Sequence, residues 1–114
     1  MSKRTSGLYI GDIFQALKKI KSYTRGLNFE KFGADPKTVD AVVRNLEIVG
    51  EAVRNLSTEV KDKYPQVPWE KMIGMRNKVA HEYFGVDTEI LWQTIKEDLP
   101  ELEKQLMPIL KSIK

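Results

Sequence analysis

Cysteine is absent from the 114-residue sequence, and histidine occurs only once, at His81. The absence of cysteine excludes disulfide bonds, thiol catalysis and every metal site that needs a cysteine ligand. A zinc site with a single histidine would need three carboxylate ligands or ligands from a second subunit. We therefore expect no metal ion and no cofactor within one chain.

Long apolar runs are also absent, since no stretch of residues is long and apolar enough to span a membrane. The basic start at residues 1–7 leads into an amphipathic stretch, whereas a secretory signal would have an apolar core there. The sequence therefore predicts a cytoplasmic protein without a membrane partner. Its net charge of +3 is compatible with RNA binding but does not require it.

Apolar residues recur along the chain at the three- and four-residue spacing of amphipathic helices. With 41% hydrophobic residues, a chain of this length can build one core, so residues 1–114 are predicted to form a single domain. We expect an all-α fold in which four helices form an antiparallel bundle. The predicted helices cover approximately residues 8–24, 36–60, 69–84 and 88–110.

Two sequence features mark the start and the contacts of the second helix. Asp35 can accept hydrogen bonds from the first turn, and Pro36 is favourable at the first helical position. Gly50 lies on the apolar stripe, where glycine is unfavourable for a helix. We therefore expect another helix to approach closely at Gly50.

Two prolines lie inside the last predicted helix. A proline in a helix removes one backbone hydrogen bond and crowds the preceding turn. Pro100 therefore predicts a kink or a break near Leu99, and Pro108 predicts another disturbance near Met107.

The chemically richest stretch is residues 75–84, which contains Arg76, Asn77, His81 and Tyr83. On a regular helix Arg76 lies on the apolar stripe, where a charge must be paired or face a cavity. Asn77 and His81 are four residues apart and are therefore neighbours on an adjoining face. Arg76 and His81 diverge by about 140° and cannot converge on one small group through helical geometry.

Two arrangements would bring Arg76 and His81 together. Either the helix ends or distorts near His81, or a two-fold dimer places the arginine of one subunit beside the histidine of the other. Structural roles stay open as well. In such roles Arg76 would pair with a carboxylate such as Glu47 or Glu51, and His81 would be an ordinary hydrogen-bonded side chain.

The stretch from Met75 to Tyr83 resembles the signature of the HEPN superfamily, in which an arginine and a polar residue precede a histidine at short spacing. The His-x-Tyr extension is similar to that of the HepT-like toxin branch. The resemblance therefore reaches across nearly the whole domain, because it also covers residues 48–52, 64–65, 67–69 and 99–100.

The resemblance implies a HEPN-like fold and a metal-independent endoribonuclease, the toxin component of a type VII toxin-antitoxin system. It also implies a homodimer in which two copies of the motif line a shared cleft that binds RNA. The cognate antitoxin would be a minimal nucleotidyltransferase, which could transfer AMP onto Tyr83.

The residue types agree with the roles that the resemblance implies. RNA supplies its own nucleophile in the 2′-OH, so cleavage needs an acid–base group and positive charge at the phosphate. His81 suits the acid–base role because histidine titrates near neutral pH. Arg76 suits the phosphate because its planar donors are always charged. Asn77 and Tyr83 would support this catalytic pair.

Two other functions stay open from the sequence. The chain could be a non-catalytic HEPN module that docks a nucleotidyltransferase or a nucleotide. It could also be a structural bundle whose motif only packs a dimer. The binding module predicts tight partner binding without RNase activity.

Overall fold

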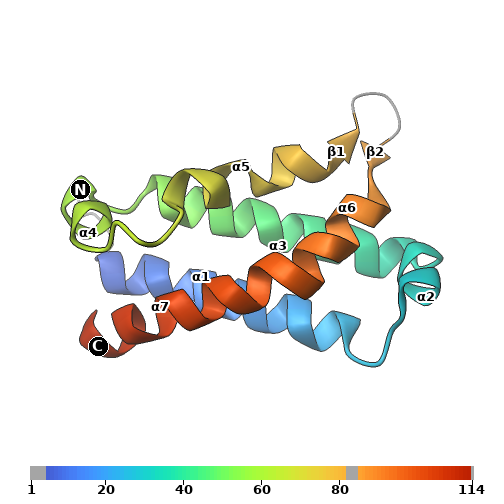
Figure 1. Ribbon diagram of the computed structural model, residues 1–114, viewed down its shortest axis with the longest axis horizontal. Coiled ribbons are helices and arrows are strands. Elements are labelled where there is room, and N and C mark those ends of the chain that lie inside the picture. The colour runs from blue at the N-terminus through green and yellow to red at the C-terminus, as the bar shows by residue number, and fades with distance from the viewer. Residues whose placement is uncertain (1–4, 82–84, 114) are drawn as a thin grey trace.

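The computed structural model describes residues 5–81 and 85–113, with Ala80, His81 and Ile113 described by their backbone only (Figure 1). All the long elements are helices, which confirms the predicted all-α class. Two-residue strands form the sole antiparallel ladder in the described part of the chain. The elements are α1 (Ser6–Thr24), α2 (Phe29–Gly33), α3 (Pro36–Arg54), α4 (Thr58–Lys63), α5 (Trp69–Val79), β1 (Ala80–His81), β2 (Gly85–Val86), α6 (Thr88–Gln93), the π-helical η1 (Thr94–Asp98) and α7 (Leu99–Ile113).

The long helices lie lengthwise, and successive ones run in opposite directions along the molecule (Figure 1). α1 packs against α3 and α7, and α3 also packs against α5. The short helix α2, which lies outside the four predicted helices, contacts α3 and α6 at one end of the molecule. Across residues 5–81 and 85–113, no helix has the length and apolar character needed to cross a membrane.

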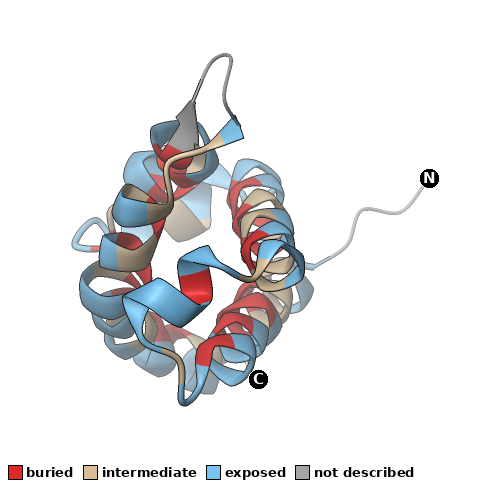
Figure 2. Ribbon diagram, turned by 90° about the vertical axis from the view of Figure 1, so that its right-hand side faces the viewer, coloured by how far each residue is buried: buried red, intermediate tan, exposed pale blue. Residues whose placement is uncertain are grey.

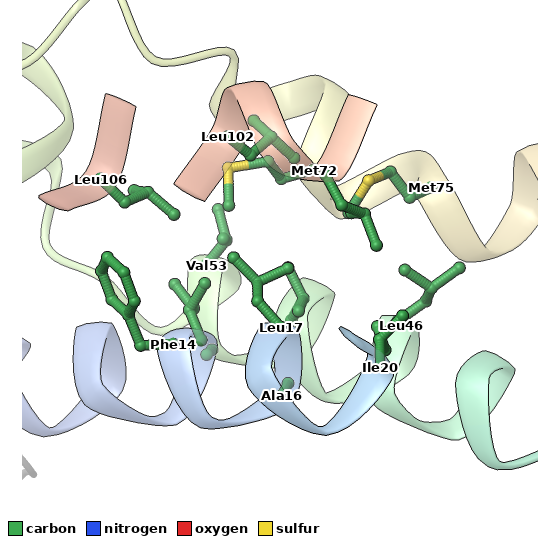
Figure 3. Close-up of a cluster of buried hydrophobic side chains, with 14 of the residues drawn as sticks. Phe14, Ala16, Leu17, Ile20, Leu46, Val53, Met72, Met75, Leu102 and Leu106 are labelled. Atoms are coloured by element: carbon green, nitrogen blue, oxygen red, sulfur yellow. The ribbon is translucent and has the colours of Figure 1, made fainter. Parts of the chain in front are cut away.

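The core lies between the facing sides of these helices, where the buried residues gather (Figure 2). Figure 3 shows that side chains from α1, α3, α5 and α7 meet there. Removal of this apolar surface from water is the main force that holds the helices together. The fully buried side chains include Ile10, Ile13, Phe32, Leu46, Met72 and Leu106.

The second predicted helix is too long. α3 ends at Arg54, whereas the apolar spacing predicts a helix to Val60. The side-chain amide of Asn55 donates to the carbonyl of Glu51 at 2.8 Å, and the hydroxyl of Ser57 accepts from the N–H of Val60 at 3.2 Å. These side chains satisfy backbone groups at the end of α3 and at the start of α4, so a separate short helix begins there.

The third predicted helix is also too long. α5 ends at Val79, whereas the pattern predicts a helix to about Phe84. The chain continues into β1, which pairs with β2. The N–H of Asp87 donates to the carbonyl of Val79 at 2.7 Å, and Gly85 has a φ of +86°, which glycine adopts without strain. This strand pairing replaces the last turns of the predicted helix.

The last predicted helix contains one wide turn. α6, η1 and α7 follow one another directly, and the N–H of Leu99 donates to the carbonyl of Thr94 in a π-helical turn. Pro100 follows at once, and a proline disturbs the helical turn that precedes it. The distortion predicted near Leu99 is therefore present as a π turn. The helix continues through Pro108 without a break. Pro108 has no N–H to donate to the preceding turn, and the disturbance predicted near Met107 stays a prediction.

The close approach predicted at Gly50 is confirmed. A Cβ atom at this position would lie 3.2 Å from the carbonyl oxygen of Ile73 in α5. α3 and α5 therefore cross with their backbones close together, and a larger residue would meet main-chain atoms that cannot easily move. Gly11, inside α1, has no such neighbour within 4 Å.

We expect Gly50→Val to lower the free energy of unfolding by about 1–3 kcal/mol, because the new side chain would push against a backbone carbonyl. Gly11→Val is the matched control. It introduces the same side chain where the new Cβ meets no atom within 4 Å, so it should change the free energy of unfolding by less than ~1 kcal/mol. Urea denaturation followed by circular dichroism measures both effects. A Gly50→Val protein as stable as the parent would contradict the close packing of α3 on α5.

Asp35 and Pro36 begin α3 as predicted. The Asp35 carboxylate accepts from the hydroxyl of Thr38 at 2.7 Å and from its backbone N–H at 3.2 Å. These hydrogen bonds hold the pKa of the Asp35 carboxyl below its ordinary value of 3.8, and the bond from the Thr38 hydroxyl has the largest effect. The charged cap therefore stabilises the fold above that pH, and this contribution is lost as the pH falls through the lowered pKa.

We expect Asp35→Ala to lower the melting temperature at neutral pH, because the start of α3 loses its hydrogen-bond acceptor. The difference from the parent should shrink as the pH falls from 3.8 through the lowered pKa, since the carboxylate of the parent is protonated over this range and loses its charge. Thermal unfolding at a series of pH values measures this convergence. A difference that stays constant across the acid range would rule out the charged cap as its cause.

Candidate active site

An open cleft of about 400 Å³ lies between α3 and α5, beside the crossing at Gly50. The cleft joins residues that are far apart in the sequence and includes two of the predicted site residues. Its charged and polar lining consists of Arg44, Glu47, Glu51 and Arg54 from α3, and Arg76 and Asn77 from α5.

Arg76 lies at the edge of the buried side of α5. Its side chain is 45% exposed, so the prediction that it lies on the apolar stripe is wrong. Its Nε donates to Oε1 of Glu47 at 3.2 Å. Arg76 is thus both paired and open to a cleft, the two conditions expected of it. The buried residues of α5 are Trp69, Met72, Met75 and Val79.

Glu47 accepts from a second arginine. Nη1 of Arg44 lies 3.4 Å from Oε2, whereas Arg76 uses Oε1. One turn further along α3, Arg54 pairs with Glu51 at 2.9 Å. Three arginines and two glutamates therefore leave one net positive charge on the lining of the cleft. In the described part of the chain, no group of three or more carboxylate or imidazole side chains is placed to hold a metal ion.

The other predicted site residues follow along the chain. Asn77 is exposed on α5 and lines the same cleft as Arg76. The backbone of His81 lies in β1 and pairs with Gly85. Tyr83 lies outside the described residues. The structure thus brings Arg76 and Asn77 together and places the backbone of His81 beyond the end of their helix.

The end of α5 changes the relation between Arg76 and His81. On a continuous helix these residues would point about 140° apart. Because α5 ends at Val79, His81 is not on the helix and this restriction does not hold. Of the two predicted arrangements, the chain adopts a helix that ends near His81. The prediction that Asn77 and His81 are neighbours on one helix face is wrong, and the two-fold dimer stays a prediction.

Arg44 is a residue of this cleft that the sequence pattern does not single out. It occupies a polar position off the apolar stripe of α3, as many solvated arginines do. The spacing of three residues to Glu47 is the signal that could have indicated their contact. The packing of α5 on α3 is what brings Arg76 to the same carboxylate.

A family model described as ribonuclease HepT-like matches residues 13–109. A candidate RNase of Caldanaerobacter subterraneus subsp. tengcongensis is 45% identical over 97% of this chain and 99% of its own length. A candidate ribonuclease HepT of Thermococcus cleftensis is 46% identical over 89% of this chain and 92% of its own. A candidate RNase of Methanocaldococcus jannaschii is 40% identical over 99% of this chain and 93% of its own. No solved structure gives a significant match.

These matches extend along almost the whole chain, and each of them names a ribonuclease. They confirm the resemblance that residues 75–83 indicate, and they confirm the prediction of a ribonuclease at the level of the family. The chain therefore belongs to the ribonuclease HepT-like family.

Proposed function

We propose that this protein is a metal-independent endoribonuclease and the toxin of a type VII toxin-antitoxin system. The proposal rests on the setting of Arg76. This arginine is half exposed and lines an open cleft, and its Nε donates a hydrogen bond to Glu47. Its Nη groups have no hydrogen-bond partner among the described residues. A guanidinium in this setting can bind a phosphate group, and the family supports RNA as the substrate.

The proposed reaction uses the nucleophile that RNA supplies. The 2′ oxygen attacks the adjacent phosphorus and forms a new bond, while the bond from phosphorus to the 5′ oxygen breaks. His81 accepts the proton of the 2′-OH, and the imidazolium of a second subunit donates a proton to the leaving 5′ oxygen. Arg76 stabilises the negative charge that builds on the phosphate. The products are a 2′,3′-cyclic phosphate and a free 5′-OH.

This reaction motivates the proposal of a homodimer with a shared cleft. Two copies of residues 76–83 would supply two imidazoles, one for each proton transfer. Asn77 lies beside Arg76 on the cleft and can orient the substrate or His81 through its amide. RNA is the proposed substrate, and the positive lining of the cleft favours its phosphates.

The proposed antitoxin is a minimal nucleotidyltransferase. Tyr83 carries a phenolic hydroxyl that can attack the α-phosphorus of ATP and take its AMP group, with release of pyrophosphate, and it follows His81 by two positions. The attached nucleotide would add bulk and negative charge next to the catalytic residues. An anionic RNA strand would then be excluded, which is a physical route to neutralisation.

We expect His81→Ala to reduce RNA cleavage by at least about 100-fold, because the substitution removes the acid–base group. Cleavage by the parent should continue in EDTA and leave 2′,3′-cyclic phosphate ends, which mass spectrometry of the fragments detects. Circular dichroism checks that the variant is folded.

A strict requirement for a divalent cation would contradict this mechanism, and so would a His81→Ala protein as active as the parent. A parent protein that binds a nucleotidyltransferase tightly but never cuts RNA would identify the non-catalytic binding module instead.

We expect co-expression with the nucleotidyltransferase to increase the mass of the parent by one or more AMP groups, whereas Tyr83→Phe should keep its unmodified mass. Tyr23→Phe is the matched control, because Tyr23 is an exposed tyrosine of α1 outside the cleft. This control should be modified like the parent. Intact-mass spectrometry measures all three proteins, and a modified Tyr83→Phe protein would show that the nucleotide is attached elsewhere.

A further inference from the structure

The carboxylate of Glu47 is shared by arginines from two different helices. Arg76 of α5 donates through Nε to Oε1 at 3.2 Å, and Arg44 of α3 approaches Oε2 with Nη1 at 3.4 Å. Each arginine uses one nitrogen for this contact. The remaining donors of both guanidinium groups have no hydrogen-bond partner among the backbone and side-chain groups that the structure describes.

The charge balance around Glu47 differs from that of its neighbour on α3. Glu51 pairs with Arg54 alone, and that pair is neutral. Glu47 lies between two arginines, so Arg44, Glu47 and Arg76 together carry one positive charge. The net positive charge of the cleft is therefore concentrated at these three residues.

Stability does not explain this arrangement. The side chain of Arg44 is 70% exposed and that of Glu47 is 38% exposed, and ion pairs in water contribute little to folding. Binding explains it better, because two guanidinium groups that contact one carboxylate lie next to each other on the surface. A nucleic-acid strand likewise presents its phosphates one after another.

Arg44 also connects two hollows on the surface. It lines the cleft between α3 and α5, and it lines a second hollow of about 210 Å³ between α1 and α3. Glu47 and Glu51 line both hollows as well. Arg44 therefore stands where the two hollows meet. Asp12 adds a third carboxylate to the second hollow, so the side of Arg44 that faces the cleft is the one suited to a phosphate.

We propose that Arg44 binds a second phosphate of the RNA strand, next to the phosphate held by Arg76, and that Glu47 positions both arginines. This inference rests on the proposed ribonuclease function. Arg76 contacts the phosphate that reacts, whereas Arg44 contacts a neighbouring one and contributes to affinity alone. Glu47 holds the Nε edge of Arg76, so that the Nη edge stays available to the substrate.

The first test measures the affinity for a fluorescently labelled, mixed-sequence single-stranded RNA in the His81→Ala background, by anisotropy over a series of KCl concentrations. Arg44→Gln should weaken binding severalfold and lower the slope of log K against log salt by about 0.7, the value for one phosphate contact on a single strand. Arg44→Lys should keep most of this slope, because it keeps the charge.

Arg25→Gln is the matched control for Arg44→Gln. Arg25 is an exposed arginine at the end of α1, outside the cleft, so its replacement changes the net charge equally. Its salt slope should equal that of the His81→Ala protein. If Arg44→Gln behaves like Arg25→Gln while the parent cleaves RNA, the second phosphate site is overturned and the ribonuclease function stands.

The second test separates turnover from binding in proteins that retain His81. Glu47→Gln should lower kcat by about tenfold or more, because Arg76 loses its charged anchor, while KM should stay equal or fall since a negative charge is removed. Arg44→Gln should show the opposite pattern, a raised KM with an unchanged kcat. Asp98→Asn is the matched control for Glu47→Gln.

Asp98 resembles Glu47 in its setting. Its side chain is 35% exposed and pairs with Lys78 of α5 at 4.0 Å, but it lies outside the cleft. Asp98→Asn should leave kcat and KM unchanged. An unchanged kcat in Glu47→Gln would overturn the positioning role. A parent protein that neither binds nor cleaves RNA would instead overturn the proposed function, and this inference with it.

Discussion

The close approach of α3 and α5 at Gly50 is the constraint on which the candidate site depends. A Cβ atom at Gly50 would lie 3.2 Å from the carbonyl oxygen of Ile73, so the two backbones nearly touch. Glu47 lies one turn before Gly50, and Arg76 lies one turn after Ile73. The crossing therefore brings Nε of Arg76 to 3.2 Å from Oε1 of Glu47. A larger residue at position 50 would separate the helices and the ion pair with them. One glycine therefore couples the packing of the core to the chemistry of the cleft.

The end of α5 is the second feature that shapes the site. A regular helix through His81 would turn it away from Arg76, and a dimer would then be needed to reunite them. The structure ends the helix at Val79, where the N–H of Asp87 takes the carbonyl that the next helical turn would have used. The rotation of about 100° per residue in a helix therefore does not set the direction of His81 relative to Arg76. A homodimer in the proposed function serves a different purpose, which is to supply a second imidazole.

The charged side chains of the cleft are 38–70% exposed, while the core beneath them is apolar and closely packed. This division has a physical consequence. Burial of apolar side chains stabilises the fold, whereas exposed ion pairs add little to it, so the cleft is free to serve binding and catalysis. Membership of the ribonuclease HepT-like family indicates the kind of chemistry, and the structure shows that Arg44 and Arg76 share the carboxylate of Glu47. In the proposed function, these arginines bind the phosphates of RNA.

The sequence by itself determined the all-α class, the start of α3 at Asp35 and the close approach at Gly50, because each follows from local rules of helix propensity and capping. It also indicated the family through a short motif, and the catalytic roles of Arg76 and His81 stay a prediction from that motif. The ends of α3 and α5 were not predicted correctly from the sequence. Side-chain caps end α3 and a strand pair ends α5, and the free energies of these alternatives differ only slightly from that of a continued helix. Only the tertiary structure decided that Arg44 and Arg76 share one carboxylate. That arrangement depends on which helices cross and how closely, and no spacing along one helix encodes it.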